Sequence, residues 1–138
     1  MFLNIPLDDC QIQGDRFQYG LELRSRYERR DDADFTGNLI DNNGKFVSRG
    51  RLHLTYQLCA DSKAKLVYQY TNLQVRPTAG GNSSTTGQDL VEAYLQRNHG
   101  DATLTVGRQK VKKGEQRLIG SLEWANSSRS WLGARIEQ

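Results

Sequence analysis

The chain lacks the features that mark a helical protein, whether soluble or membrane-spanning. No apolar run approaches the roughly 18 residues of a transmembrane helix, and no segment repeats its apolar residues with a helical period. Hydrophobic types make up only 36% of the 138 residues, and the mean hydropathy is -0.73. Six Tyr, four Phe and two Trp nevertheless argue against disorder. The sequence therefore predicts one ordered domain that is built with little apolar material.

Cysteine is scarce as well, which limits covalent and metal chemistry. Cys10 and Cys59 are the only two, so at most one disulfide can form. No Cys or His spacing resembles a zinc site. We expect two free thiols, although pairing of Cys10 with Cys59 stays open.

Long runs of one charge are also absent. No stretch of five or more like charges occurs, so nothing indicates a nucleic-acid-binding arm. The formal net charge of +3 and the pI near 9.0 give a mild basic excess, which would suit a membrane surface or an acidic polymer. The opening residues, MFLNIPLDDCQIQG, lack the basic and apolar regions of a signal peptide, so an export signal is expected outside this sequence.

Signatures of catalysis are missing too. His53 falls on the polar face of an expected strand and His99 in a short turn; there is no HExxH pair, and GSLEW differs from GxSxG. The glycine-rich TAGGNSSTTG lacks the GK[ST] of a phosphate-binding loop, which predicts a flexible connection instead. We assign no catalytic residue and no cofactor, and we expect that the protein is not an enzyme.

One segment begins like a calcium-binding loop. DADFTGNLIDNN places Asp32, Asp34 and Thr36 at alternate positions, but Asn43 stands twelfth, where a bidentate Glu is expected. A solvated surface loop is therefore the expected structure, and we assign no metal site.

Apolar and polar residues alternate with a period of two, which is typical of strands. In FQYGLELRSRYERR, Tyr19, Leu21 and Leu23 alternate with Glu22, Arg24 and Arg26. In DLVEAYLQR the same rule places Val91, Ala93 and Leu95 together on the apolar face. The pattern predicts about six strands, at residues 17–30, 46–60, 64–76, 89–97, 102–109 and 129–138.

The expected connections between these strands alternate in length. Long ones cover residues 31–45, 77–88 and 111–128, and short ones cover ADSK and NHGD. This order is typical of an outer-membrane barrel with short periplasmic turns and longer outer loops. It predicts an all-β, antiparallel up-and-down meander.

The charged face of the strands carries the main functional signal. Charged side chains that faced lipid would cost roughly 2–4 kcal/mol each near the bilayer midplane, whereas a water-filled lumen can hold them. One interpretation is a series of cross-strand ion pairs that satisfy one another. The other is a ladder of cations that attracts a multivalent anion through many weak sites. The charged positions are Arg24, Arg26, Arg49, Arg51, Lys65 and Arg135 against Glu22, Glu28, Glu92 and Glu137.

The last part of the chain resembles a known family. VGRQKVKKGEQRLIGSLEWANSSRSWLGAR is similar to the pattern GRQ…GdqRLiG…eWsN…Rtf.G.R of the alginate-export family of bacterial outer-membrane porins. Upstream, LRSRYERRDDADF, RGRLHLTYQL and DLVEAYLQR resemble the first, second and fourth strands of that family. The resemblance covers nearly the whole chain from about Phe17.

The resemblance implies a barrel with an arginine-rich lumen, narrowed by loops that fold inward, through which an anionic polysaccharide leaves the cell. The residues 107–131 would then be an arginine-bearing loop in or over the pore. The positions that match the family pattern are Arg108, Gln109, Gln116, Arg117, Glu123, Trp124, Asn126, Arg129 and Arg135. With the polar-face residues, the expected permeation path comprises Arg24, Arg26, Arg49, Arg51, Arg108, Arg117, Glu123, Trp124, Arg129 and Arg135.

A pore of polymer size needs roughly 16–18 strands, so the six strands are expected to be an incomplete part of a larger transmembrane barrel. We expect an N-terminal extension at residues 1–16 and the N-terminal part of the barrel at residues 17–138. The expected location is the bacterial outer membrane, with a monomeric barrel at full length. The expected partners are outer-membrane lipid and alginate-like polysaccharide or small anions, without nucleic acid.

Two other functions remain open. A soluble β-sheet module could bind acidic glycans through the same basic face. An enzyme that hydrolyses polysaccharide would need two facing carboxylates; Glu22 with Glu92 is the sort of pair to mutate, although nothing in their spacing recommends them.

Overall fold

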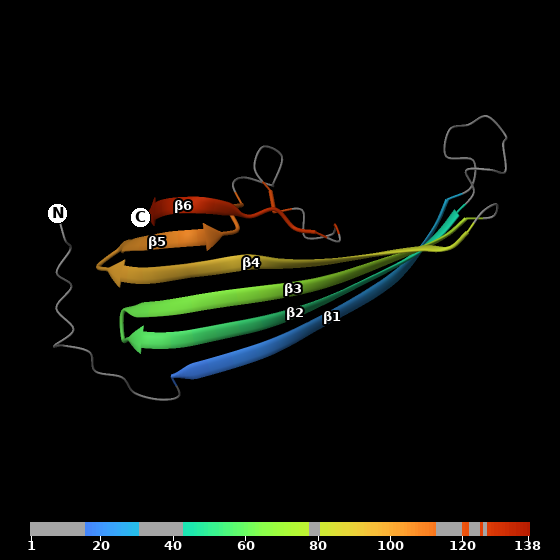
Figure 1. Cartoon of the computed structure of the whole chain (residues 1–138). Coiled ribbons are helices and arrows are strands. Elements are labelled where there is room, and N and C mark those ends of the chain that lie inside the picture. Colours follow the sequence, from blue (N-terminus) through green and yellow to red (C-terminus); the bar gives the residue numbers. More distant parts are fainter. Residues whose placement is uncertain (1–15, 31–42, 78–80, 113–119, 122–124, 126) are drawn as a thin grey trace.

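The protein forms one twisted antiparallel sheet (Figure 1). The computed structural model describes residues 16–30, 43–77, 81–112, 120–121, 125 and 127–138. The strands are β1 (Phe17–Arg30), β2 (Asn43–Cys59), β3 (Ser62–Pro77), β4 (Ser83–His99), β5 (Ala102–Gln109) and β6 (Trp131–Glu137). Each strand pairs with the next in chain order. The all-β, up-and-down meander expected from the sequence is confirmed. The described residues contain no helix long and apolar enough to cross a membrane.

Short connections lie at one end of the sheet and longer ones at the other. Residues 60–61 join β2 to β3, and residues 100–101 join β4 to β5. The connection between β3 and β4 is shorter than the sequence predicts. The glycine-rich segment TAGGNSSTTG is not a loop throughout, because β4 already begins at Ser83, and Thr85 pairs with Leu73 of β3. Thr and Ser are tolerated in an exposed, paired strand. Pairing of β4 with β3 therefore outweighs the tendency of this glycine-rich sequence to form a loop.

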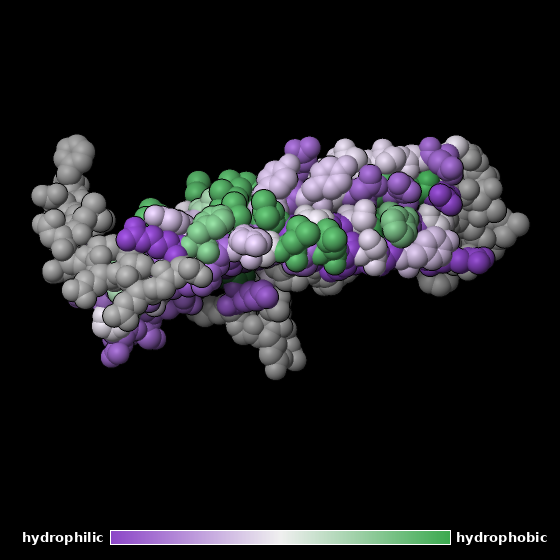
Figure 2. Space-filling view, turned by 90° about the horizontal axis from the view of Figure 1, so that it is seen from below, coloured by the Kyte–Doolittle hydropathy of each residue, from purple (hydrophilic) through white to green (hydrophobic). Residues whose placement is uncertain are grey.

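Alternation along the strands produces an apolar face whose large side chains are exposed. Tyr19 is 80% exposed and Leu132 is 84% exposed. The register aligns such residues across the sheet, as in the row Leu21, Leu52, Tyr68 and Leu90. Figure 2 shows hydrophobic residues gathered near the middle of the surface, with more hydrophilic residues towards both ends. A soluble domain would bury these side chains, so this face requires an apolar environment.

The opposite, polar face contains the shielded side chains. Arg51 is 3% exposed, Gln69 is 1% exposed and Glu92 is 8% exposed, beside the fully buried Val67. Buried charge together with exposed leucine reverses the distribution of a soluble sheet protein.

A β-bulge in β4 moves one residue to the polar face. Val67 pairs with Glu92, whereas Tyr68 pairs with Leu90, so Val91 is the extra residue. Val91 is fully buried, and Leu90 takes the exposed position in its place. The prediction that Val91 shares the apolar face of Leu95 is therefore wrong, because an inserted residue shifts the alternation by one.

The short-turn end contains a disulfide and an anchored carboxylate. Cys59 is disulfide-bonded, so the expectation of free thiols is wrong for this residue; Cys10 lies outside the described residues. Ser62 Oγ donates a hydrogen bond of 2.8 Å to Asp61, and Arg97 Nε donates one of 3.0 Å. The hydrogen bond from Ser62, followed by that from Arg97, lowers the pKa of the Asp61 carboxyl. Asp61 is thus held as an anion between its two donors.

Close approach of two strands makes glycine necessary at position 107. Gly107 has φ of +130°, and a Cβ there would lie 2.3 Å from the Ala93 carbonyl oxygen and 2.8 Å from the Cα of Tyr94. Both contacts involve backbone, which cannot rotate away. The glycine of the VGRQ motif is therefore a requirement of the β4–β5 pairing.

We predict that Gly107→Ala lowers the free energy of unfolding by about 1–3 kcal/mol, because the side chain combines a strained φ with a clash against backbone. Urea titration of the protein in lipid vesicles, followed by circular dichroism, measures this. Gly133→Ala is the matched control, since Gly133 pairs with Gly107 and a Cβ there would meet nothing within 4 Å. Equal loss of stability in the two variants would contradict the steric explanation.

Candidate functional site: an arginine cluster beneath the β5–β6 connection

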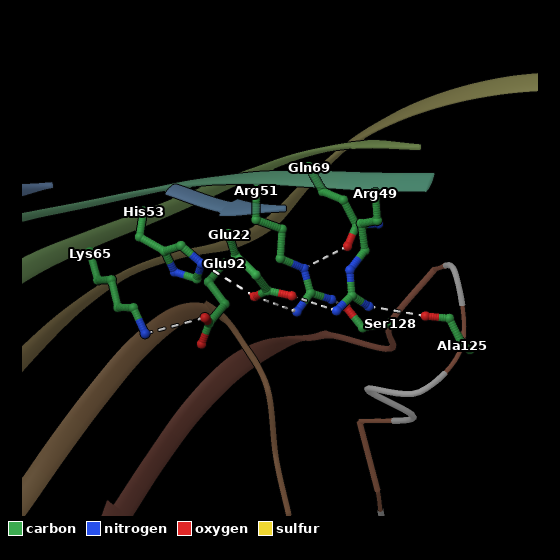
Figure 3. A network of polar contacts seen from close by, with 9 residues as sticks. All are labelled: Glu22, Arg49, Arg51, His53, Lys65, Gln69, Glu92, Ala125 and Ser128. Atoms are coloured by element: carbon green, nitrogen blue, oxygen red, sulfur yellow. Dashed lines mark hydrogen bonds and ion pairs between the residues drawn. The ribbon is translucent and has the colours of Figure 1, made fainter. Parts of the chain in front are cut away.

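The register of β1, β2 and β3 brings together a cluster of polar side chains. Glu22 lies directly opposite Arg51, and Arg51 lies opposite Gln69. Arg49 lies two residues before Arg51 on the same face of β2 and completes the set. We call Glu22, Arg49, Arg51 and Gln69 the arginine cluster (Figure 3). Each strand contributes through its period-two pattern, so the cluster is a direct product of the sequence alternation.

One carboxylate serves several cations in this cluster. Arg49 Nη2 donates a hydrogen bond of 2.6 Å to Glu22 Oε1, while Arg51 Nη1 lies 3.6 Å from Oε2. His53 Nε2 lies 3.7 Å from the same Oε2 atom. Arg24 stands directly opposite Arg49 in the register, which places a third guanidinium nearby. Within the described part of the chain, more cationic side chains than carboxylates therefore lie around Glu22.

Residues between β5 and β6 cover the cluster. We call Gly120, Ser121, Ala125 and residues 127–130 the strap. Arg49 Nη1 donates to the Ala125 carbonyl at 3.0 Å, and Arg51 Nη2 donates to Ser128 Oγ at 2.9 Å. The strap also bonds within itself, from the Arg129 amide to the Ser121 carbonyl at 2.8 Å. Ser121 and Ser128 are 0% and 6% exposed, so the strap packs closely on the polar face.

The strap offers these guanidinium groups neutral oxygen atoms. A carbonyl or hydroxyl satisfies a donor without cancelling its charge. Gln69 acts in the same way, since its Oε1 accepts a 2.7 Å hydrogen bond from Arg51 Nε. Among the described residues, Arg49 and Arg51 are thus bonded to neutral oxygen acceptors as well as to Glu22.

Elsewhere on the sheet, ion pairs account for much of the charge. Two of them join neighbouring strands: Lys65 with Glu92 at 3.3 Å, and Arg108 with Asp89 at 3.0 Å. Two more lie within a strand: Arg26 with Glu28 at 2.5 Å, and Arg135 with Glu137 at 3.3 Å. Each of these cations therefore has a carboxylate partner of its own, whereas among the described residues Arg49 and Arg51 share Glu22.

The structure brings only some of the expected path residues together. Arg24, Arg49 and Arg51 lie at the arginine cluster, and Arg26 lies along the same strand. Arg108 donates a 2.8 Å hydrogen bond to Ser130 Oγ on the strap side, and the side chain of Arg129 is exposed. Arg135 lies on the edge strand β6. Arg117, Glu123 and Trp124 lie outside the described residues, and so do Asp32, Asp34 and Thr36 of the calcium-like loop.

Sequence reasoning missed several partners in the site. Gln69 follows the same alternation as its neighbours on β3, so its burial could have been found from the pattern. Ser128 and the Ala125 carbonyl could not, since their contacts to β2 span 77 and 76 residues. Asp89 could not be found either, since its contact with Arg108 depends on the pairing of β4 with β5.

Neither metal binding nor hydrolysis gains support from the described residues. They contain no group of three or more His, Cys, Asp and Glu side chains that could hold a metal ion. Glu22 is engaged by Arg49, and Glu92 by Lys65. Glu92 is also nearly buried, at 8% exposure. These two carboxylates act structurally as partners of cations.

A curved meander with an apolar exposed face and a charged covered face defines a class, namely the sheet of a β-barrel that separates an apolar from an aqueous phase. Comparison with family models matches residues 15–138 to the alginate export family. The chain belongs to that family, and its sheet is consistent with part of an alginate-export β-barrel. Searches of curated proteins and of solved structures found no match to this chain.

We predict that Ser128→Ala loosens the strap, because Arg51 Nη2 loses a buried acceptor. A lost hydrogen bond to a charged group is worth about 1.5–3 kcal/mol, so hydrogen exchange of the Arg129 amide should become at least about tenfold faster. Mass spectrometry of exchanged peptides measures the rate. Ser127→Ala is the control, since Ser127 is the exposed neighbour of the same type. Unchanged exchange in Ser128→Ala would show that the hydroxyl does not hold the strap.

Proposed function

We propose that the protein forms part of an outer-membrane barrel that conducts anionic polysaccharide, such as alginate, or related anions, by passive transport through an arginine-rich lumen. The observation that carries this proposal is the inverted distribution of side chains: exposed leucines on one face, and Arg49 and Arg51 at 6% and 3% exposure on the other. Membership of the alginate export family supplies the transport process. A transport role requires no catalytic residue.

The height of the apolar face fits a bilayer. On β2, outward positions are apolar from Leu52 to Leu58, and the row at Ser48, Ser25 and Asn72 is polar. The ten residue steps from the polar row at Ser48 to Leu58 span about 34 Å at about 3.4 Å per residue. A strand tilted by about 40° would then cross about 26 Å, close to the apolar band of about 25 Å in outer-membrane barrels. Outer-membrane lipid is accordingly the proposed surrounding of this face.

Closure of the barrel requires further strands. β1 and β6 each pair on one side only within the described sheet. Unpaired strand edges in hydrocarbon are costly, so we propose that residues 17–138 form the N-terminal part of a barrel of roughly 16–18 strands. The short turns at residues 60–61 and 100–101 would face the periplasm. The full-length barrel would be monomeric, since closure leaves no edge to share.

The arginine cluster suits a permeant with repeated carboxylates. Transport needs sites that bind weakly enough to release. Carboxylate groups of the polymer can replace the neutral acceptors around Arg49 and Arg51 and regain a charge-assisted bond. Because Glu22 already shares its charge among several cations, no single sugar unit would be held tightly.

We predict that Arg24→Glu combined with Arg26→Glu in the full-length protein shifts the reversal potential of the channel toward cations in a salt gradient. These two side chains lie on the polar face beside the arginine cluster, where a change of charge alters the electrostatic potential of the proposed lumen. Planar bilayer recording measures the shift. Arg76→Glu is the matched control, because Arg76 lies opposite Gly44 in an outward row at the far end of the sheet. An equal reversal potential in wild type and double variant would remove Arg24 and Arg26 from the path.

Fractionation separates this proposal from a soluble module that binds acidic glycans. A barrel partitions into detergent with the outer membrane and changes its gel mobility on heating. Recovery in the soluble fraction, together with glycan binding, would favour the soluble module.

A further inference from the structure

The apolar face is hollowed at its short-turn end. A depression of about 390 Å³ is lined by Arg97, His99, Ala102, Leu104 and Ile136. Its walls come from three strands, because Arg97 lies opposite Leu104 and Leu104 lies opposite Ile136. Two basic side chains thus stand beside an apolar floor.

The guanidinium of Arg97 is anchored in a way that leaves one edge available. Its Nε donates to Asp61 Oδ2 at 3.0 Å, and its side chain is 43% exposed. Among the described residues, neither terminal nitrogen of Arg97 has a partner. Asp61 is itself fixed by Ser62 Oγ at 2.8 Å. The pair of Nη groups is therefore oriented and can receive two oxygen atoms of one anion.

A second hollow lies on the same face, farther from the short turns. It has a volume of about 350 Å³, and Leu95, Val106, Ala64 and Ala93 are among its lining residues. Leu95 precedes Arg97 by two positions, and Val106 follows Leu104 by two, so the linings of the two hollows are neighbours along β4 and β5. The small side chains of Ala64 and Ala93 leave space between larger neighbours. Two neighbouring hollows thus lie between Arg97 and the middle of the apolar face.

The position of Arg97 along β4 would place it at the level of the lipid headgroups in a bilayer. It lies three positions before the turn at residues 100–101, where the row of exposed leucines ends. Basic pockets at this level of membrane proteins bind lipid phosphates, and long basic side chains reach toward them.

We propose that this face binds one phospholipid, with its phosphate at Arg97 and His99 and one acyl chain in the groove beside Ala64 and Ala93. The inference rests on the proposed function, because it needs the apolar face to meet a bilayer. The ligand is defined by two features together: a phosphate that Arg97 holds by its Nη groups, and a chain that fills the hollow beside Leu95.

The test is native mass spectrometry of the detergent-solubilised protein after equilibration with phosphatidylglycerol. We expect wild type to retain the lipid and Arg97→Gln to bind it about tenfold more weakly, the effect of losing one charge-assisted contact. Ala64→Leu should weaken retention as well, because it fills the groove. Arg76→Gln is the control on the same face at the far end of the sheet, and it should retain lipid like wild type.

Two further arms identify what is recognised. Diacylglycerol, which lacks the phosphate, should be retained less than phosphatidylglycerol, and millimolar inorganic phosphate should not displace the lipid. Equal retention of the two lipids, or complete displacement by inorganic phosphate, would overturn the phospholipid assignment. Equal retention by Arg97→Gln and Arg76→Gln would overturn the role of Arg97.

Conductance distinguishes failure of this inference from failure of the proposed function. Arg97→Gln should insert and conduct like wild type, since Arg97 lies on the outward face. If wild type and Arg97→Gln both insert and conduct, and the variant retains lipid as well as wild type does, only the proposed lipid site is wrong. If the full-length wild type fails to enter bilayers, the proposed function itself is wrong.

Discussion

Successive side chains of a strand point to opposite faces, so Arg49 and Arg51 can be buried only if Leu52 and its outward neighbours are exposed. Burial of two guanidinium groups would be costly without partners, and Glu22, Gln69 and the strap provide them. The apolar face in turn needs surroundings without water. Burial of Arg49 and Arg51 on one face of β2 thus determines which side of the sheet meets apolar surroundings. The register with the neighbouring strands extends the same division of faces across the sheet.

The described part of the strap meets the two buried guanidinium groups with neutral acceptors. Ser128 Oγ accepts a hydrogen bond from Arg51, and the Ala125 carbonyl accepts one from Arg49. A neutral acceptor satisfies the donor but adds no opposite charge. Lys65 differs, because the carboxylate of Glu92 is its partner.

The sequence was sufficient for the strands, because period-two alternation is a local property. It placed β1 and β5 at their observed bounds and assigned Leu21, Leu52 and Arg51 to their correct faces. It failed where pairing between distant residues decides the outcome. Val91 changes face because of a bulge against β3, Ser83 joins β4 because β3 extends past it, and Cys59 is disulfide-bonded. The strap contacts could not be predicted either, since they depend on how a long connection folds over β2.

Arg49 reaches the strap through the main-chain carbonyl of Ala125 and not through a side chain. Every amino acid carries that carbonyl, so substitutions at position 125 can preserve the contact as long as the backbone keeps its path. The contact of Arg51 depends on a particular hydroxyl and has no such freedom. Natural variation in this segment should consequently be uneven, with wide variation permitted at one attachment point and narrow variation at the other. A sequence survey that scored only side-chain identity would overlook the first attachment altogether.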